Sequence, residues 1–405
     1  MDLLIEYLII ALSSVLAVIA VKMIYFKVLV LAKSKNLVDN PDARKLQKRP
    51  VPILGGVAVY FGFIFATFMG SAAMTYLEMT PVVSVLPVVL SLSVMLYVGA
   101  MDDLLGLTPT TRFMVEILSV LAMIYMSGGC IDSLHGQWGI GSYSWYVAVP
   151  LTVFASVGII NAINMIDGVN GLSSGLCITC CCMFGVAFLY AHDVVNAMLA
   201  FVMAGALVPF VLHNVFGNKS KMFIGDAGTM MLGMLMSWFV ICLLRSDGRL
   251  VYTVSMYHFN MVALAIAILS VPVADTLRVM TARVVHGFSP FRPDKTHLHH
   301  IFIRVGVSHV VTAISEILID VFIVFIWYVA TVHFHAGLDM QLYVVVGAAM
   351  VFVWGTYYFV NWHANRRTRF MNWLTHISLA TQVGDRRWWL YMQCWLDKPA
   401  HRRSE

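Results

Sequence analysis

The sequence NAINMIDGVNGL (residues 161–172) lies between two long apolar runs, 145–165 and 171–190. Its polar side chains recur at every third residue, namely Asn161, Asn164, Asp167 and Asn170. The stretch is therefore expected to end one membrane helix and begin the next. Gly168 and Gly171 allow a tight turn and leave room for a ligand to approach the backbone. Helix capping by Asn and Asp would explain the same residues without any function; similar clusters elsewhere in the chain favour a site.

The composition is that of a membrane protein. Of the 405 residues 60% are hydrophobic and 12% are charged, whereas about a quarter are charged in soluble domains. Only helices and closed barrels satisfy their backbone inside lipid, and no strand alternation is evident. We therefore predict an all-α polytopic membrane protein. The start, MDLLIE, lacks a basic region, so the first apolar run is expected to be retained.

About eleven apolar runs approach the roughly 20 residues that a spanning helix needs. They lie near 3–26, 54–74, 82–101, 110–127, 145–165, 171–190, 194–215, 228–244, 259–285, 309–333 and 340–362. The basic residues concentrate in alternate loops, such as 33–49 and 283–304. The positive-inside rule then predicts an external N-terminus and a cytoplasmic C-terminus.

Two regions follow from this pattern: a transmembrane domain over 1–363 and a basic, Trp-rich tail over 364–405. The tail is expected either to lie in the membrane interface or to be a solvated extension. The CxxC of Cys177 and Cys180 falls inside an apolar span, where packing is a more common role than redox chemistry.

Polar clusters are predicted to meet at the cytoplasmic face. Five stand out: 48–56, Asp102 with Asp103, 161–172, 222–228, and Arg283 with 288–300. Four aspartates on one face provide oxygen ligands that suit Mg²⁺ or Mn²⁺ shared with water and phosphate. An acid pair can also be a solvated loop, and Asp226 can be an N-cap.

Three histidines in the last cluster raise two interpretations. His297, His299 and His300 could bind zinc, but no Cys or Glu accompanies them at ligand spacing. Their mixture with arginines and lysines favours the binding of phosphate and sugar oxygens. Glu116 and Asp275, predicted inside spans, are expected to be satisfied intramembrane polar groups.

These features together suggest phosphoryl transfer to a lipid acceptor at the membrane edge. A transporter is the main alternative, because polytopic chains with membrane acids often move ions. Transport predicts polar groups near the bilayer midplane, whereas here they gather at one face. An inactive scaffold is a second alternative, and the retained aspartates argue against it.

Four ordered motifs then carry a resemblance that covers about residues 30–306. They are MDD (101–103), NAINMIDGVNGL (161–172), MFIGDAG (222–228) and SPFRPDKTHLHH (289–300). The chain resembles the polyprenyl-phosphate N-acetylhexosamine-1-phosphate transferases of the MraY/WecA superfamily. The HLHH version, in a chain of this length with ten to eleven spans, resembles the WecA branch rather than the MraY branch.

The resemblance implies a transferase that depends on Mg²⁺ or Mn²⁺ and moves GlcNAc 1-phosphate from UDP-GlcNAc to undecaprenyl phosphate. The alternative is the same reaction with another UDP-N-acetylhexosamine as the donor. The resemblance also implies the bacterial inner membrane and an early step of O-antigen, enterobacterial common antigen or related glycan synthesis. The expected partners are these substrates and membrane lipids, with a homodimer as one arrangement and no nucleic acid.

Residue roles also follow from the resemblance. The metal would be held by Asp226 and Asn164, and the catalytic acids would be Asp102, Asp103 and Asp167. The nucleotide would face Lys48, Gly168 and Asn170. The diphosphate and sugar would be bound by Arg283, Asp294, His297, His299 and His300. Direct attack by the lipid phosphate is favoured over an aspartyl-phosphate intermediate. Two departures stand out: Asn170 and Gly106 occupy positions where many relatives carry acids.

Overall fold

The computed structural model describes residues 2–40, 50–79, 82–247, 258–290, 292, 295–366, 368–380 and 387–401. The predicted site residues Lys48 and Asp294 lie outside these ranges. Two-residue strands β1 (Val38–Asp39) and β2 (Val51–Pro52) pair antiparallel, and helices dominate elsewhere in the described chain.

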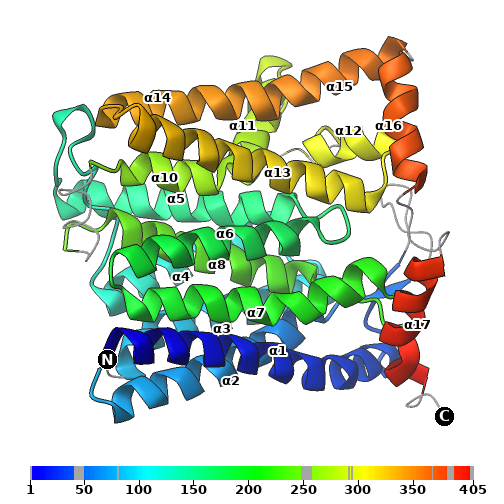
Figure 1. The fold of residues 1–405 in the computed structure, drawn as a ribbon, viewed down its shortest axis with the longest axis horizontal. Coiled ribbons are helices and arrows are strands. Elements are labelled where there is room, and N and C mark those ends of the chain that lie inside the picture. Colours follow the sequence, from blue (N-terminus) through cyan, green and yellow to red (C-terminus); the bar gives the residue numbers. More distant parts are fainter. Residues whose placement is uncertain are drawn as a thin grey trace.

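Long helices run side by side in a bundle (Figure 1). They are α1 (Asp2–Ser34), α2 (Gly55–Tyr76), α3 (Leu86–Leu105), α4 (Pro109–Ser127), α5 (Trp145–Met165), α6 (Leu172–Tyr190), α7 (Val194–Phe216), α8 (Gly225–Leu244), α13 (His309–Tyr328), and α14 (Leu338–Ala349) joined to α15 (Gly355–Arg366) by the π-helical turn Met350–Trp354. Shorter helices are α10 (Met261–Ile268), α11 (Ser270–Val285), α12 (Leu298–Arg304), α16 (Arg369–Ala380) and α17 (Arg387–His401). The described residues contain ten segments able to cross a membrane, or eleven with the bent pair α10–α11. The predicted fold class is confirmed.

Helix α8 is the centre of the bundle, and every residue from Ala227 to Leu244 is buried. Its neighbours approach closely through glycine. A Cβ on Gly56 of α2 would lie 2.4 Å from the Gly228 Cα, and one on Gly99 of α3 would lie 2.5 Å from the Ala227 Cα. Because side chains are absent at these points, α2 and α3 hold the first turn of α8 backbone to backbone.

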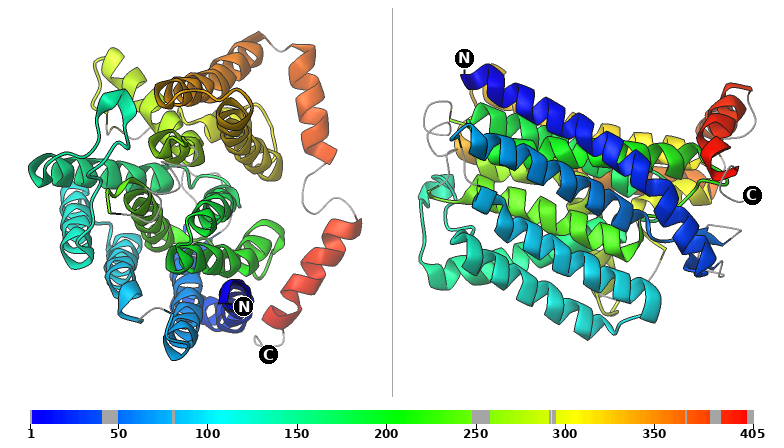
Figure 2. Two further views of the ribbon diagram at one scale, coloured as in Figure 1. Left: turned by 60° about the vertical axis from the view of Figure 1, so that its left-hand side comes forward. Right: turned by 90° about the horizontal axis from the view of Figure 1, so that it is seen from below.

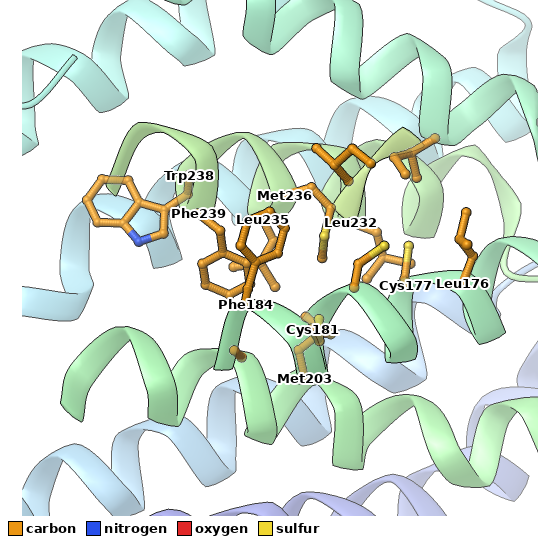
Figure 3. Close-up of a cluster of buried hydrophobic side chains, with 14 of the residues drawn as sticks. Leu176, Cys177, Cys181, Phe184, Met203, Leu232, Leu235, Met236, Trp238 and Phe239 are labelled. Atoms are coloured by element: carbon orange, nitrogen blue, oxygen red, sulfur yellow. The ribbon is translucent and has the colours of Figure 1, made fainter. Parts of the chain in front are cut away.

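Apolar side chains fill the space between α6, α7 and α8. Figure 3 shows Cys177, Cys181 and Phe184 of α6 close to Leu232, Met236 and Phe239 of α8. Cys177, Cys180 and Cys181 are free thiols and fully buried. The packing interpretation of the cysteine cluster is confirmed.

One predicted span is broken. We expected a continuous helix over 259–285, but α10 and α11 meet at 78°. Pro272 stands in the first turn of α11, where it cannot donate a backbone hydrogen bond. Asp320 of α13 accepts hydrogen bonds from the Ser270 hydroxyl (2.9 Å) and the Val271 amide (3.2 Å), which satisfies the new helix start. Pro272 was the sequence signal for this break.

The two termini lie at opposite ends of the bundle, as an odd number of spans requires (Figures 1 and 2). Helices α16 and α17 run across the long helices at the C-terminal end. The direction of the bundle in the membrane stays a prediction from the loop charges.

The glycine contact with α8 can be tested through stability. Gly99→Ala places a methyl group against the Ala227 backbone, and such overpacking costs about 1–3 kcal/mol. We expect a lower thermal unfolding midpoint in detergent. Gly158→Ala in α5 is the matched control, because its new Cβ meets nothing within 4 Å and alanine favours helix. Equal midpoints for the two variants would contradict the close packing.

Candidate active site

The predicted polar clusters come together at one end of the bundle. Here α1, α3, α5 and α7 end and α2, α6 and α8 begin. A cavity of about 1070 Å³ opens there. Its lining includes seven residues predicted from the sequence: Asp103, Asp167, Gly168, Asn170, Asp226, His299 and His300. The expectation that distant motifs share one pocket is confirmed.

The start of α8 is held by Asp103 of α3. The Asp103 carboxylate accepts hydrogen bonds from the backbone N–H groups of Asp226 (3.0 Å) and Ala227 (3.1 Å). Gly225 precedes them with φ +71°, a conformation that favours glycine. Asp226 is thus not the N-cap of its helix; it lies in the first turn, and another helix supplies the acceptor.

Both oxygens of the Asp226 carboxylate have a partner, but the side chain is still partly exposed. Its Oδ1 accepts a hydrogen bond from the Asn164 amide (2.8 Å), which also donates to the Thr229 hydroxyl (2.7 Å). The Asp226 side chain is 37% exposed, and the residue lines the cavity. Asn164 therefore orients Asp226, and its predicted role as a direct metal ligand stays a prediction.

Arg112 at the start of α4 joins three acids. Its guanidinium lies 3.1 Å from Asp102 Oδ2, 3.4 Å from Glu116 Oε1 and 3.6 Å from Asp226 Oδ2. Glu116 is fully buried and also accepts a bond from Asn161 (2.5 Å). Arg112 relieves the repulsion between carboxylates that would otherwise face one another.

Arg112 is not among the site residues predicted from the sequence. Glu116 stands four residues later, a spacing at which opposite charges meet on a helix. That spacing was the available signal, but the partners Asp102 and Asp226 come from other helices. Asp102 also accepts the Leu107 N–H (2.8 Å), and it is not among the described lining residues of the cavity.

The turn between α5 and α6 places Asp167 in the cavity. Its carboxylate accepts a bond from the Ser173 hydroxyl (2.5 Å). The surrounding protein and the nearby Asp226 raise the pKa of Asp167 to about 6, and the Ser173 bond opposes this shift. Gly171, at φ +76°, donates its N–H to Asn214, and the Asn170 N–H donates to His309. None of the four spaced polar residues caps α6, since its N-cap is Gly171.

The histidine motif is held by buried charges behind the cavity. Asp275 accepts hydrogen bonds from His297 Nδ1 (2.8 Å) and the Leu298 amide (3.1 Å), and it pairs with Arg278 (2.8 Å). Arg278 in turn covers the Tyr357 ring at 3.6 Å. Asp275 and Glu116 are satisfied polar groups, as expected.

His299 carries two ring nitrogens with no partner among the described residues, although it is 1% exposed. Burial, with His300 and His297 nearby, lowers its pKa well below the usual value. A Cβ on Gly168 would lie 2.4 Å from His299 Nε2, so Gly168 leaves room for the ring. A neutral, unsatisfied imidazole at the cavity wall is the kind of group that a bound ligand completes.

Of the described residues predicted to bind diphosphate and sugar, two do not line the cavity, and neither does Asn164, predicted to hold the metal. Arg283 is 5% exposed and donates to the Pro290 carbonyl (2.5 Å), and His297 points at Asp275. The structure adds cations that sequence reasoning did not single out for the site: Lys33, Lys219 and Lys221 line the cavity.

The described residues hold no group of three His, Cys, Asp or Glu side chains placed to chelate a metal together. Mg²⁺ in phosphoryl-transfer sites commonly takes one or two carboxylates and completes its shell with water and substrate phosphates. The partly exposed carboxylate of Asp226, which lines the cavity together with Asp103 and Asp167, fits that requirement. A zinc site, which needs three or four protein ligands, fits less well.

Comparison with known proteins identifies relatives. The family model "Glycosyl transferase family 4" matches residues 85–244. The decaprenyl-phosphate N-acetylglucosaminephosphotransferase of Mycobacterium leprae (strain TN) is 30% identical over 293 residues, 69% of this chain and 73% of the relative. The undecaprenyl-phosphate α-N-acetylglucosaminyl 1-phosphate transferase of Yersinia pestis is 28% identical over 278 residues, 67% of this chain and 70% of the relative. The enzyme of the same name from Escherichia coli (strain K12) is 28% identical over 288 residues, 68% of this chain and 71% of the relative.

Replacing Arg112 tests the charge balance. Arg112→Gln leaves three acids without their shared cation, and breaking such a pair costs about 3–5 kcal/mol when it is buried. We expect a large loss of thermal stability at pH 8 that shrinks as pH falls towards 5, because protonation removes the repulsion.

Arg245→Gln is the control for Arg112→Gln. Arg245 pairs with Asp247, whose side chain is 68% exposed, at the other end of the bundle. Exposed pairs contribute about 0–1 kcal/mol. If Arg112→Gln were no more destabilising than Arg245→Gln, the proposed charge balance would be wrong.

Proposed function

The chain belongs to glycosyl transferase family 4, and we propose that it transfers N-acetylglucosamine 1-phosphate from UDP-N-acetylglucosamine to undecaprenyl phosphate, releasing UMP. The observation that supports this reaction most is the position of the cavity. Acids, amides, histidines and lysines meet at the end of a membrane bundle, where a water-soluble nucleotide and a lipid head group can reach the same space.

Asp226 is the residue best arranged to hold a divalent cation. Asn164 and Asp103 fix its position, and its partly exposed side chain lines the cavity. When bound, Mg²⁺ would neutralise charge on the sugar-nucleotide diphosphate. The lysines and His299 are then available to the phosphate oxygens, and Asn170 and Gly168 to the nucleoside.

The lipid phosphate is the nucleophile in this scheme. One of its oxygens attacks the β-phosphorus in line, the bond between that phosphorus and the α–β bridging oxygen breaks, and UMP leaves with the electron pair. A phosphate monoester already carries charge, since its second pKa is about 6. A covalent aspartyl-phosphate is therefore unnecessary.

Among the three acids predicted to be catalytic, Asp167 is the one we now assign to the lipid phosphate. It lines the cavity, and its pKa of about 6 is close to that of the phosphate, so a proton can move between them at little cost. Asp102 is occupied by Arg112 and the Leu107 amide, and Asp103 by the first turn of α8. We assign both to positioning.

The family context and the basic loops support a place in a bacterial inner membrane, with the cavity on the cytoplasmic side. The glycan pathway stays a prediction from the resemblance. The broken α10–α11 span is a feature that transporters share, but Asp320 satisfies that break and the cavity lies at the bundle end.

The reaction can be tested directly with purified protein, Mg²⁺, undecaprenyl phosphate and radiolabelled UDP-GlcNAc. We expect label in the organic phase and stoichiometric UMP. Asp226→Asn should weaken binding of the divalent cation that offsets the charge on the diphosphate. Turnover should therefore fall by at least about a hundredfold. Glu78→Gln, at an exposed position at the other end, should leave turnover unchanged. Absence of transfer from every UDP-N-acetylhexosamine would refute the proposal.

Lys221 gives a pH prediction. Burial lowers its pKa to about 8, so its positive charge is present below pH 8 and lost as pH rises above it. UDP binding should weaken by about three- to tenfold between pH 7 and 9, the effect of losing one charge beside a phosphate. Lys221→Arg keeps its charge and should flatten this dependence in calorimetric titrations. The same alkaline weakening in both proteins would exclude Lys221.

A further inference from the structure

The C-terminal helices α16 and α17 lie across the bundle at the end that holds the cavity (Figures 1 and 2). They follow Leu338–Arg366, which contains α14 and α15 and is the last described segment able to span a membrane. A helix that runs across the spans is oriented along the plane of the membrane. The function proposed above uses neither helix, yet each makes a specific contact with a turn that borders the cavity.

Helix α17 contacts the turn between α7 and α8 through Asp397. Its carboxylate accepts hydrogen bonds from the amides of Asn218 (3.3 Å), Lys219 (3.0 Å) and Ser220 (2.9 Å), and from the Ser220 hydroxyl (2.6 Å). Three successive amides converging on one carboxylate form a nest that is specific for an anion. Asp397 is 6% exposed. The same turn carries Lys219 and Lys221 to the cavity.

Helix α16 contacts the turn between α12 and α13 through Ser378, which is fully buried. Its hydroxyl accepts the Ser308 N–H (2.5 Å) and donates to the Gly306 carbonyl (3.0 Å). His309, the next residue, lines the cavity and accepts the Asn170 N–H (3.2 Å). The two tail helices thus support two separate turns of the cavity wall.

The outer faces of these helices carry large exposed aromatic side chains. They are Trp373 (58% exposed), Trp388 (54%), Tyr391 (75%) and Trp395 (53%). Exposed basic residues accompany them, including Arg369, Arg387 and Lys398. Aromatic and basic side chains on a helix along the membrane surface match a layer of anionic lipid head groups.

We propose that α16 and α17 form an interfacial brace. Their outer faces bind the anionic lipid surface, and their inner faces hold the turns at 217–221 and 306–309 through Asp397 and Ser378. The brace rests on the proposed function only in that the two turns border the cavity proposed to bind the sugar nucleotide. Contact of α16 and α17 with lipid should therefore make these turns more ordered.

Membrane contact can be measured at Cys394, which is exposed on α17. Cys182 is the other exposed cysteine among the described residues, so a Cys182→Ser background isolates the label. In nanodiscs containing phosphatidylglycerol, an environment-sensitive dye at Cys394 should be quenched by lipids spin-labelled near the head group, and less so in purely zwitterionic discs. Quenching only by a water-soluble agent would refute the membrane contact.

The link to the cavity is tested with Asp397→Asn, which keeps the shape and removes the charge. We expect faster amide hydrogen exchange at 218–220 and about tenfold weaker UDP binding, the scale of losing hydrogen bonds to a charged acceptor. KM for UDP-GlcNAc should rise while kcat changes little. Asp247→Asn, at the opposite end, is the control. Unchanged exchange and unchanged UDP affinity in a folded Asp397→Asn protein would overturn the brace.

Tyr391→Gln provides a second variant that touches no cavity turn, in case Asp397→Asn fails to fold. It should reduce lipid quenching and raise the exchange rate at 218–220; normal exchange despite lost quenching would overturn the link. These readouts need no lipid acceptor. A wild-type protein without transferase activity would therefore defeat the proposed reaction and leave the brace to be decided by quenching and exchange.

Discussion

The first turn of α8 begins between other helices at the edge of the cavity, and its buried amides need acceptors from the protein. Asp103 provides one carboxylate for two of them, and glycines on α2 and α3 let the neighbouring backbones come close enough to hold the turn. Asp226 is one of the two residues whose amides bond to Asp103. The hydrogen bonds that complete the helix start therefore also place the Asp226 side chain at the cavity. The position of the most important carboxylate is thus set by backbone hydrogen bonding rather than by a flexible loop.

Charge balance is the second requirement of this arrangement. Asp102, Asp226 and Glu116 converge from three helices, and Arg112 contacts all three. One guanidinium offsets only part of the charge of three carboxylates. In the proposed reaction, a divalent cation delivered with the diphosphate would offset the rest, because it could bind both the Asp226 carboxylate and the phosphate oxygens.

The hydrophobic runs predicted the number and order of the helices, because spanning length and backbone satisfaction leave few alternatives in lipid. Spacing and motif order also predicted that Asp103, Asp167, Asp226 and His299 share a pocket. What each carboxylate touches could not be read in this way: Asp103 caps a helix 123 residues away in the chain, and Arg112 serves acids on other helices. The break before Pro272 had a visible signal, whereas the nest around Asp397 had none, since backbone amides leave no trace in side-chain patterns.

The central proposal is that Asp226 coordinates the divalent cation bound to the sugar nucleotide, at the point where α3, α5 and α8 meet. The direct measurement is anomalous X-ray diffraction from the protein with Mn²⁺ and UDP-GlcNAc. The account predicts one manganese peak about 2.1 Å from an Asp226 carboxylate oxygen, bridged to the diphosphate and lost in Asp226→Asn crystals. A nucleotide bound elsewhere, or a manganese peak remote from Asp226, would contradict it.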